Sequence, residues 1–128
     1  MIPAGVQVYV ALEPVDMRFG FERLSGLVRE RVGYEARSGA LFVFFAKRRH
    51  AMKVIFADAT GLCIFYKRLD RGTFEIPVPD GPDATHVEID EAALDALLDG
   101  ILVDKNPKSQ RKARALHLTQ LLAHDNAN

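Results

Sequence analysis

Three short apolar runs separated by tight connections are the feature that most limits how this chain can fold. The runs cover 41–46, 52–57 and 62–66 and are rich in aromatic and β-branched residues, which is typical of β-strands. The connection between the last two runs contains Gly61, which tolerates the positive φ of a tight turn. The sequence therefore predicts an antiparallel three-stranded meander.

Basic side chains lie at one end of this predicted meander. The first run ends at Lys47, the second begins at Met52, and the third ends just before Lys67. Because neighbouring strands alternate in direction, we expect these positions to meet. The predicted cluster comprises Lys47, Arg48, Arg49, Lys53, Lys67, Arg68 and Arg71. Concentrated positive charge repels itself, so such a cluster favours contact with an anion.

Two details of the cluster have alternative interpretations. A turn centred on Thr60 predicts that Lys53 lies opposite Lys67, a repulsive pair that an anion between the two ammonium groups would relieve. The alternative is a solvated, charge-rich edge that prevents sheets from aggregating. The aromatic residues Phe44, Phe45 and Tyr66 alternate with the basic ones. They could stack on bases, although such residues more often fill the core.

The remaining pattern predicts a single α+β domain. Residues 6–12 alternate as a strand with one buried face, and an amphipathic helix is expected over 17–32 with Asp16 as its N-cap and Gly33 at its end. Further expected elements are short strands at 73–76 and 86–89, a loop at 77–83 and a helix at 91–100 capped by Asp90. We expect a mixed or antiparallel sheet of about four to six strands. Helix 17–32 should cover one face, with helix 91–100 near an edge.

Charge is strongly segregated along the chain, although its formal net charge is zero. Residues 18–71 hold twelve Lys or Arg against five Asp or Glu, residues 80–104 hold eight acids and no Lys or Arg, and residues 105–114 hold five bases and no acid. We therefore predict a domain over 1–104 followed by a basic C-terminal tail or helix over 105–128.

Signs of catalysis are weak. The four histidines show no metal-ligand spacing, and Asp16, Asp58 and Asp70 are explained by a predicted cap and two predicted turns. No phosphate-binding loop or nucleophile elbow occurs. We predict neither catalytic residues nor a metal or cofactor. The single cysteine, Cys63, and the lack of a signal peptide or of an apolar stretch of roughly 20 residues favour a cytoplasmic protein outside the membrane.

Several segments occur in an order that is specific as a set. They are 16–21, 39–44 followed by Arg48 and Arg49, then Lys53, 61–62, 66–69, 71–74, Pro77 and 97–101. This set resembles the small TnpB-type (Orf2-like) accessory proteins of insertion sequence 66 transposable elements, over roughly residues 1–101. The resemblance implies a bacterial mobile-element protein that acts beside a separate, larger transposase. The chain lacks the tryptophans usual in that family.

Three functional hypotheses follow. The first is a non-catalytic accessory protein for DNA transposition that binds nucleic acid through Arg18, Lys47, Arg48, Arg49, Lys53, Lys67, Arg68 and Arg71 and assists the transposase. The second is a protein-only adaptor that docks on the transposase, or on another element-encoded protein, without contacting DNA, in part through the acidic segment 80–104. The third is a metal-dependent nuclease. In each case the acidic segment could also fold over the basic end and mask it, and homo-oligomerisation is left open. We favour the first.

Overall fold

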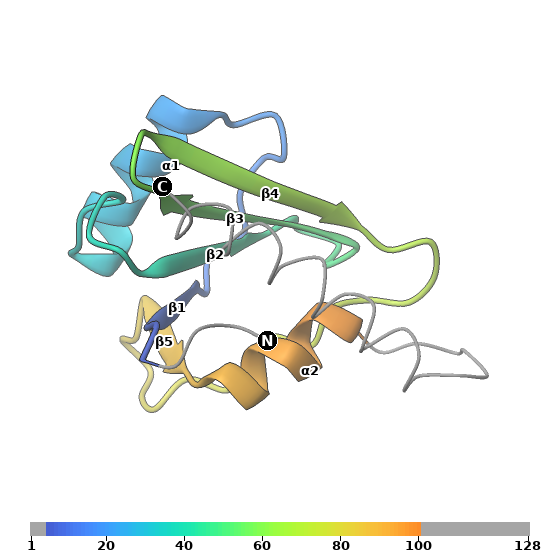
Figure 1. Ribbon diagram of the computed structural model, residues 1–128. Helices are drawn as coiled ribbons and strands as arrows, with labels where there is room; N and C mark the ends of the chain where they lie inside the picture. Colours follow the sequence, from blue (N-terminus) through green and yellow to red (C-terminus); the bar gives the residue numbers. More distant parts are fainter. Residues whose placement is uncertain (1–4, 101–128) are drawn as a thin grey trace.

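The computed structural model describes residues 5–100, which form one five-stranded mixed sheet with the strand order β4-β3-β2-β1-β5 (Figure 1). β1 pairs in parallel with β2, and all other neighbours are antiparallel. The strands are β1 (Val8–Ala11), β2 (Leu41–Phe45), β3 (Ala51–Ala57), β4 (Leu62–Arg68) and β5 (His86–Ile89). The helices are α1 (Phe21–Leu27), its π-helical continuation η1 (Val28–Val32), and α2 (Glu91–Asp99). The predicted α+β class, the meander and the strand at 86–89 are confirmed.

Helices cover both faces of the sheet (Figure 1). On one face, Leu94, Leu97 and Leu98 of α2 join a core that includes Val8 and Val10. On the other face, residues of α1 and η1 pack with Tyr9 and Phe42 among others. The expectation that β1 buries one face is therefore wrong, as is the placement of helix 91–100 near an edge. The uninterrupted apolar run 41–46 could have indicated that both faces are covered, because strands buried on both sides lack the alternation of apolar and polar residues.

The first helix begins later than its apolar stripe predicts. Gly20 is the N-cap, in an extended conformation, and Asp16 is not a cap. The Oδ1 atom of Asp16 instead accepts a hydrogen bond from the backbone N–H of Arg18 at 2.8 Å, since an aspartate readily binds the backbone two residues onward. The predicted end is confirmed: Gly33 has a φ of 80°, and its N–H donates to the Val28 carbonyl at 3.0 Å.

Two later predictions had opposite outcomes. Thr73 forms an isolated bridge, so the expected strand at 73–76 is wrong, and the chain continues as loop towards β5. Asp90 does cap α2, since its Oδ1 atom accepts from the N–H of Ala93 at 2.8 Å. The predicted tail at 105–128 lies outside the described residues. Within residues 5–100, no helix is both long enough and apolar enough to cross a membrane.

Candidate nucleic-acid interface

The turn between β3 and β4 sets the register of this hairpin. The N–H of Asp58 donates to the Gly61 carbonyl at 2.8 Å, and Asp58 Oδ1 accepts from the N–H groups of Thr60 and Gly61 at 2.8 and 2.7 Å. The hairpin axis therefore falls between Ala59 and Thr60, not on Thr60.

This register places Lys53 opposite Tyr66 and Lys67 opposite Met52. The predicted pairing of Lys53 with Lys67 is wrong by one residue. A shift of one residue moves a side chain to the other face of a sheet. The two lysines thus point to opposite faces rather than repelling each other across the ladder.

Lys53 is buried on the face of the sheet that α1 covers, where it binds other groups of the protein. Its side chain is buried, with 9% exposure, and its Nζ atom donates to the Phe19 carbonyl oxygen at 2.9 Å. The same Nζ atom lies 4.9 Å from the centroid of the Tyr66 ring. A buried ammonium group needs such partners because leaving water is costly for a charge. Lys53 therefore connects the sheet to the loop before α1.

Lys67 has the equivalent position on the α2 side. Its Nζ atom donates to the carbonyl oxygen of Leu98, in the last turn of α2. Lysine side chains near a helix C-terminus bind carbonyl groups that lack an intrahelical partner and are attracted by the helix dipole. Lys67 therefore connects the sheet to α2.

The other predicted cations of the meander gather in solvent at one end of the sheet. The N–H of Leu69 donates to the His50 carbonyl at 2.8 Å and that of Phe74 to the Arg49 carbonyl at 2.7 Å, so the β2–β3 turn is bound to the segment after β4. Arg68 also pairs with Ala51 in the β3–β4 ladder. The residues brought together, here called the basic turn cluster, are Lys47, Arg48, Arg49, Arg68 and Arg71, and all are exposed.

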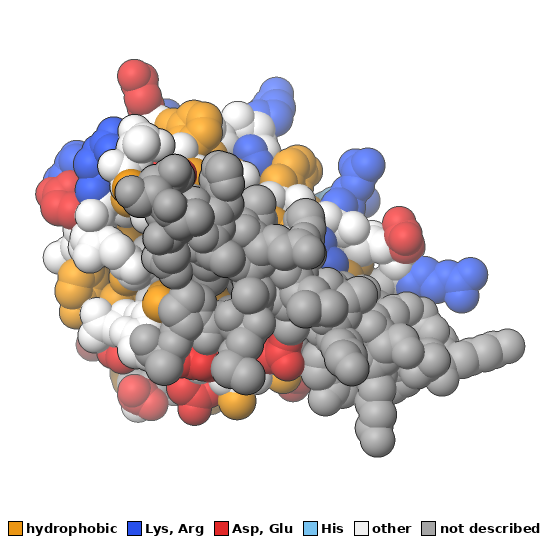
Figure 2. Space-filling model, in the orientation of Figure 1, with side chains coloured by type: hydrophobic (Ala, Val, Ile, Leu, Met, Phe, Trp, Pro, Cys, Tyr) orange, Lys and Arg blue, Asp and Glu red, His pale blue; other side chains and the backbone are white. Residues whose placement is uncertain are grey.

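Among the described residues no carboxylate forms an ion pair with this cluster, although Asp70, exposed between Arg68 and Arg71 in the sequence, offsets part of its charge. The ion pairs found in this part of the chain join Arg18 to Asp16, Arg29 to Glu35 and Arg31 to Glu13. Figure 2 shows Lys and Arg side chains projecting where β4 ends, with an acidic side chain between them, whereas Asp and Glu side chains gather along β5 and α2. The described acidic residues of β5 and α2 therefore lie apart from the basic turn cluster.

Arg18 lies at the same end of the sheet but already has an anionic partner. Its loop is held there by the N–H of Val15, which donates to the Phe45 carbonyl at 2.9 Å. The Nε and Nη2 atoms of Arg18 donate to the Asp16 carboxylate at 3.1 and 2.7 Å. These hydrogen bonds are the main reason that the pKa of Asp16 falls to about 2. Both side chains reach solvent, so an anion would compete with Asp16 for Arg18.

The aromatic candidates separate clearly. Phe44 and Phe45 are buried, with exposures of 0% and 1%, and belong to the two cores. Tyr66 is 51% exposed. Of the three proposed stacking residues, only Tyr66 can present its ring to a ligand.

The start of α1 adds residues that sequence reasoning missed. A hollow there is lined by Gly20, Phe21, Glu22 and Arg23. Phe21 is 49% exposed, and the guanidinium carbon of Arg23 lies 4.6 Å from the centroid of the Phe19 ring. These residues were expected inside an amphipathic helix over 17–32, with Phe21 on its apolar stripe, so the exposure of Phe21 could not be predicted. Gly20, which is the N-cap, was the residue that could have indicated the later start of α1.

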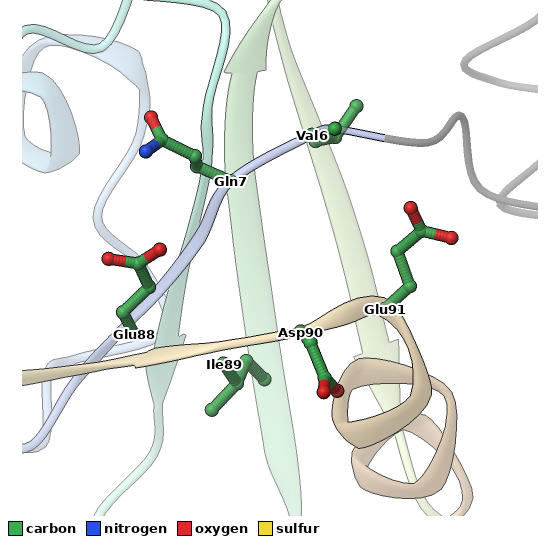
Figure 3. A pocket seen from close by; sticks show the side chains of 7 residues that line it. Val6, Gln7, Glu88, Ile89, Asp90 and Glu91 are labelled. Carbon is green, nitrogen blue, oxygen red and sulfur yellow. The ribbon is translucent and has the colours of Figure 1, made fainter.

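A second hollow lies at the acidic edge, where β1 and β5 meet the start of α2 (Figure 3). Figure 3 shows the carboxylates of Glu88 and Glu91 pointing to different sides of the chain, while that of Asp90 turns into α2, which it caps. Among residues 5–100, no group of three His, Cys, Asp or Glu side chains is arranged as metal ligands would be.

Comparison with known proteins gives a consistent result. The family model described as IS66 Orf2 like protein matches residues 6–108, close to the expected extent of the resemblance. The uncharacterized protein y4hO of Sinorhizobium fredii (strain NBRC 101917 / NGR234) is 41% identical over 103 residues, which cover 79% of this chain and 87% of that protein. The uncharacterized protein y4jC of the same strain is 36% identical over 105 residues, covering 80% and 88%. No solved structure matches the chain. The chain therefore belongs to the IS66 Orf2-like family, which supports an accessory role associated with transposition.

Proposed function

We propose that this protein is a non-catalytic accessory factor that binds DNA through the basic turn cluster and assists a separate transposase. The observation that carries the proposal is the pair of backbone hydrogen bonds, from Leu69 to His50 and from Phe74 to Arg49, that brings five exposed cations together. Family membership supplies the context of transposition.

Phosphate is the anion that this arrangement fits best. Four members of the cluster are arginines, whose planar guanidinium groups can bind phosphate oxygens through two parallel hydrogen bonds. Such contacts give affinity and position on DNA without reading its sequence. A factor that grips DNA in this way can hold an element end while another protein performs the chemistry.

A gel-shift titration tests the proposal, with element-end DNA and a scrambled duplex at about 50 and about 200 mM salt. We expect Arg48→Glu to weaken binding to both duplexes roughly tenfold or more and to reduce the salt slope by at least about 1. The matched control is Arg37→Glu, an equal charge change at an exposed loop residue that precedes β2, at the opposite end of that strand.

The outcomes are distinct. Binding that is weakened by Arg48→Glu and largely kept in Arg37→Glu supports the cluster as the interface. Equal losses in the two variants would mean that net charge alone attracts DNA. Unchanged affinity in Arg48→Glu, and also in the double variant Arg48→Glu/Arg71→Glu, would end the proposal.

The acidic edge favours a second candidate, a protein adaptor that docks on a basic surface of the transposase. Glu88 and Glu91 line the hollow of Figure 3, away from the basic turn cluster. The test is co-purification with the transposase after nuclease treatment. Loss of the partner in Glu88→Lys/Glu91→Lys, with retention in Arg48→Glu, would support this candidate, and the reverse pattern would exclude the acidic edge as the docking site.

A further inference from the structure

Tyr66 is a large aromatic residue that is exposed within a strand, whereas most strand residues of this sheet are buried or half-buried. It is the third residue from the end of β4, which is an edge strand of the sheet, and 51% of its surface is exposed. Arg68, two residues onward, lies on the same face because side chains alternate along a strand, about 7 Å away along the chain. The exposed ring therefore adjoins the basic turn cluster.

The ring is supported from within the protein. The Nζ atom of Lys53 lies 4.9 Å from the ring centroid and is itself held at 2.9 Å by the Phe19 carbonyl. Because Lys53 is buried, this cation is a fixed part of the structure and restricts how the ring can move. A ring held in place in advance loses little conformational entropy when a flat ligand binds to it.

Further aromatic and cationic groups lie near this position. α1 packs against both β3 and β4, and Phe21 at its start is 49% exposed. Arg23 lies over the Phe19 ring, whose residue also supplies the carbonyl that holds Lys53. Exposed aromatic rings interleaved with cations are the arrangement by which proteins bind single-stranded nucleic acid, where bases stack on rings and cations follow the backbone.

We propose that Tyr66 is a stacking platform for an unpaired base, so that the interface prefers single-stranded DNA to duplex. This inference rests on the proposed function, because Arg68 and the rest of the basic turn cluster would hold the flanking phosphates. A duplex keeps the faces of its bases stacked on each other, whereas an unpaired base can place its face on the tyrosine ring.

Fluorescence anisotropy tests the inference, with labelled oligothymidylate of roughly 12 nucleotides and a duplex of equal length as probes. Loss of one stacked base costs about 1–3 kcal/mol, so we expect Tyr66→Ala to weaken binding of the single strand about 5- to 150-fold. Affinity for the duplex should change less than about twofold, and Tyr66→Phe, which keeps the ring, should retain wild-type affinity for both probes. The matched control is Tyr34→Ala, which removes another part-exposed tyrosine, one that stacks on Tyr9.

A second readout follows from the composition, since the chain has three tyrosines and no tryptophan. Stacking on Tyr66 should quench tyrosine emission when unlabelled oligothymidylate is added. This quenching should disappear in Tyr66→Phe, although the affinity remains.

Three results would overturn the inference: unchanged single-strand affinity in Tyr66→Ala, equal losses for the two probes, or a Tyr66→Phe variant as weak as Tyr66→Ala. Each would leave DNA binding through the basic turn cluster intact, provided that Arg48→Glu still weakens both probes. If Arg48→Glu weakens neither, the proposed function itself fails. The two failures are therefore distinguishable.

Discussion

The β3–β4 ladder and the turns at its end carry the same kind of residue but use it differently. Lys53 and Lys67 lie within the ladder, where helical layers cover the sheet, and each donates to a backbone carbonyl of a different layer. Arg48 and Arg71, a few residues away, lie in exposed turns. A basic residue near a candidate binding surface is therefore not always part of it. Whether a helix or loop packs over a basic side chain decides if that side chain stabilises the fold or remains in solvent.

This difference revises the set of candidate binding residues. Lys53 and Lys67 support the layers from which the surface is built, and Arg18 is paired with Asp16. Only the basic turn cluster combines exposure, proximity and the lack of a carboxylate partner among the described residues. Substitutions at Lys53, Lys67 and Asp16 distinguish cations that stabilise the fold from cations that face solvent.

The largest effect on stability is expected for Lys53→Ala. The substitution removes a buried side-chain stem and the hydrogen bond to the Phe19 carbonyl, and we expect a loss of about 3 kcal/mol in the free energy of unfolding. Arg48→Ala, an exposed change in the nearby turn, should cost less than about 0.5 kcal/mol. Urea unfolding of the two variants and the wild type measures both values.

A companion variant, Lys53→Met, separates packing from hydrogen bonding. It keeps an unbranched apolar stem, so its cost should fall to about 1–2 kcal/mol. Equal stability of Lys53→Ala and Arg48→Ala would contradict the structural role given to Lys53.

A smaller effect is expected for Lys67→Met. It removes the hydrogen bond to the Leu98 carbonyl at the end of α2 and should cost about 1 kcal/mol. The control is Arg68→Met, the adjacent exposed residue, which should be close to neutral for stability. Hydrogen exchange gives a local readout, because the last turn of α2 should lose protection in Lys67→Met alone. A Lys67→Met protein with wild-type stability and strongly reduced DNA affinity would instead return Lys67 to the binding surface.

The smallest effect concerns Asp16 and its dependence on pH. Arg18 lowers the folded-state pKa of Asp16 from 3.8 to about 2, so the carboxylate stabilises the fold above about pH 4. This contribution is lost as the pH falls towards 2. We expect Asp16→Asn to be slightly less stable than the wild type at about pH 6 and the difference to shrink at about pH 2.5, as thermal unfolding would measure. The contribution is modest because both side chains reach solvent.

The same variant tests whether the ion pair with Asp16 reduces the contribution of Arg18 to DNA affinity. Freed from its carboxylate, Arg18 should bind phosphate, so Asp16→Asn should bind duplex slightly more tightly than the wild type at low salt. A weaker complex would show that Asp16 positions the loop for binding.

Local features of the sequence were enough for much of the fold. The strands of the meander, the strand at 86–89 and the capping of α2 by Asp90 depend on residue pattern and turn chemistry within a few positions. The start of α1 was missed because both Asp16 and Gly20 are suitable N-cap residues. Asp16 instead accepts a hydrogen bond from the backbone of Arg18, and Gly20 is the N-cap. The second covered face was missed because it requires α2, distant in sequence, to pack on strands of both halves of the chain.

The amino-acid sequence was enough to place the strands of the meander and the strand at 86–89, to indicate the family, and to group Lys47, Arg48, Arg49, Arg68 and Arg71 at one end of the sheet. It could do so because periodicity and turn residues act locally. Which of the predicted cations face solvent depends on packing between segments that are distant in sequence. Closure of the turn by Asp58 and Gly61 moves the register by one residue and turns Lys67 to the α2 face, whereas pairing of β3 with β2 places Lys53 on the α1 face. The segments packed on each face cover these two lysines, and the basic turn cluster stays in solvent.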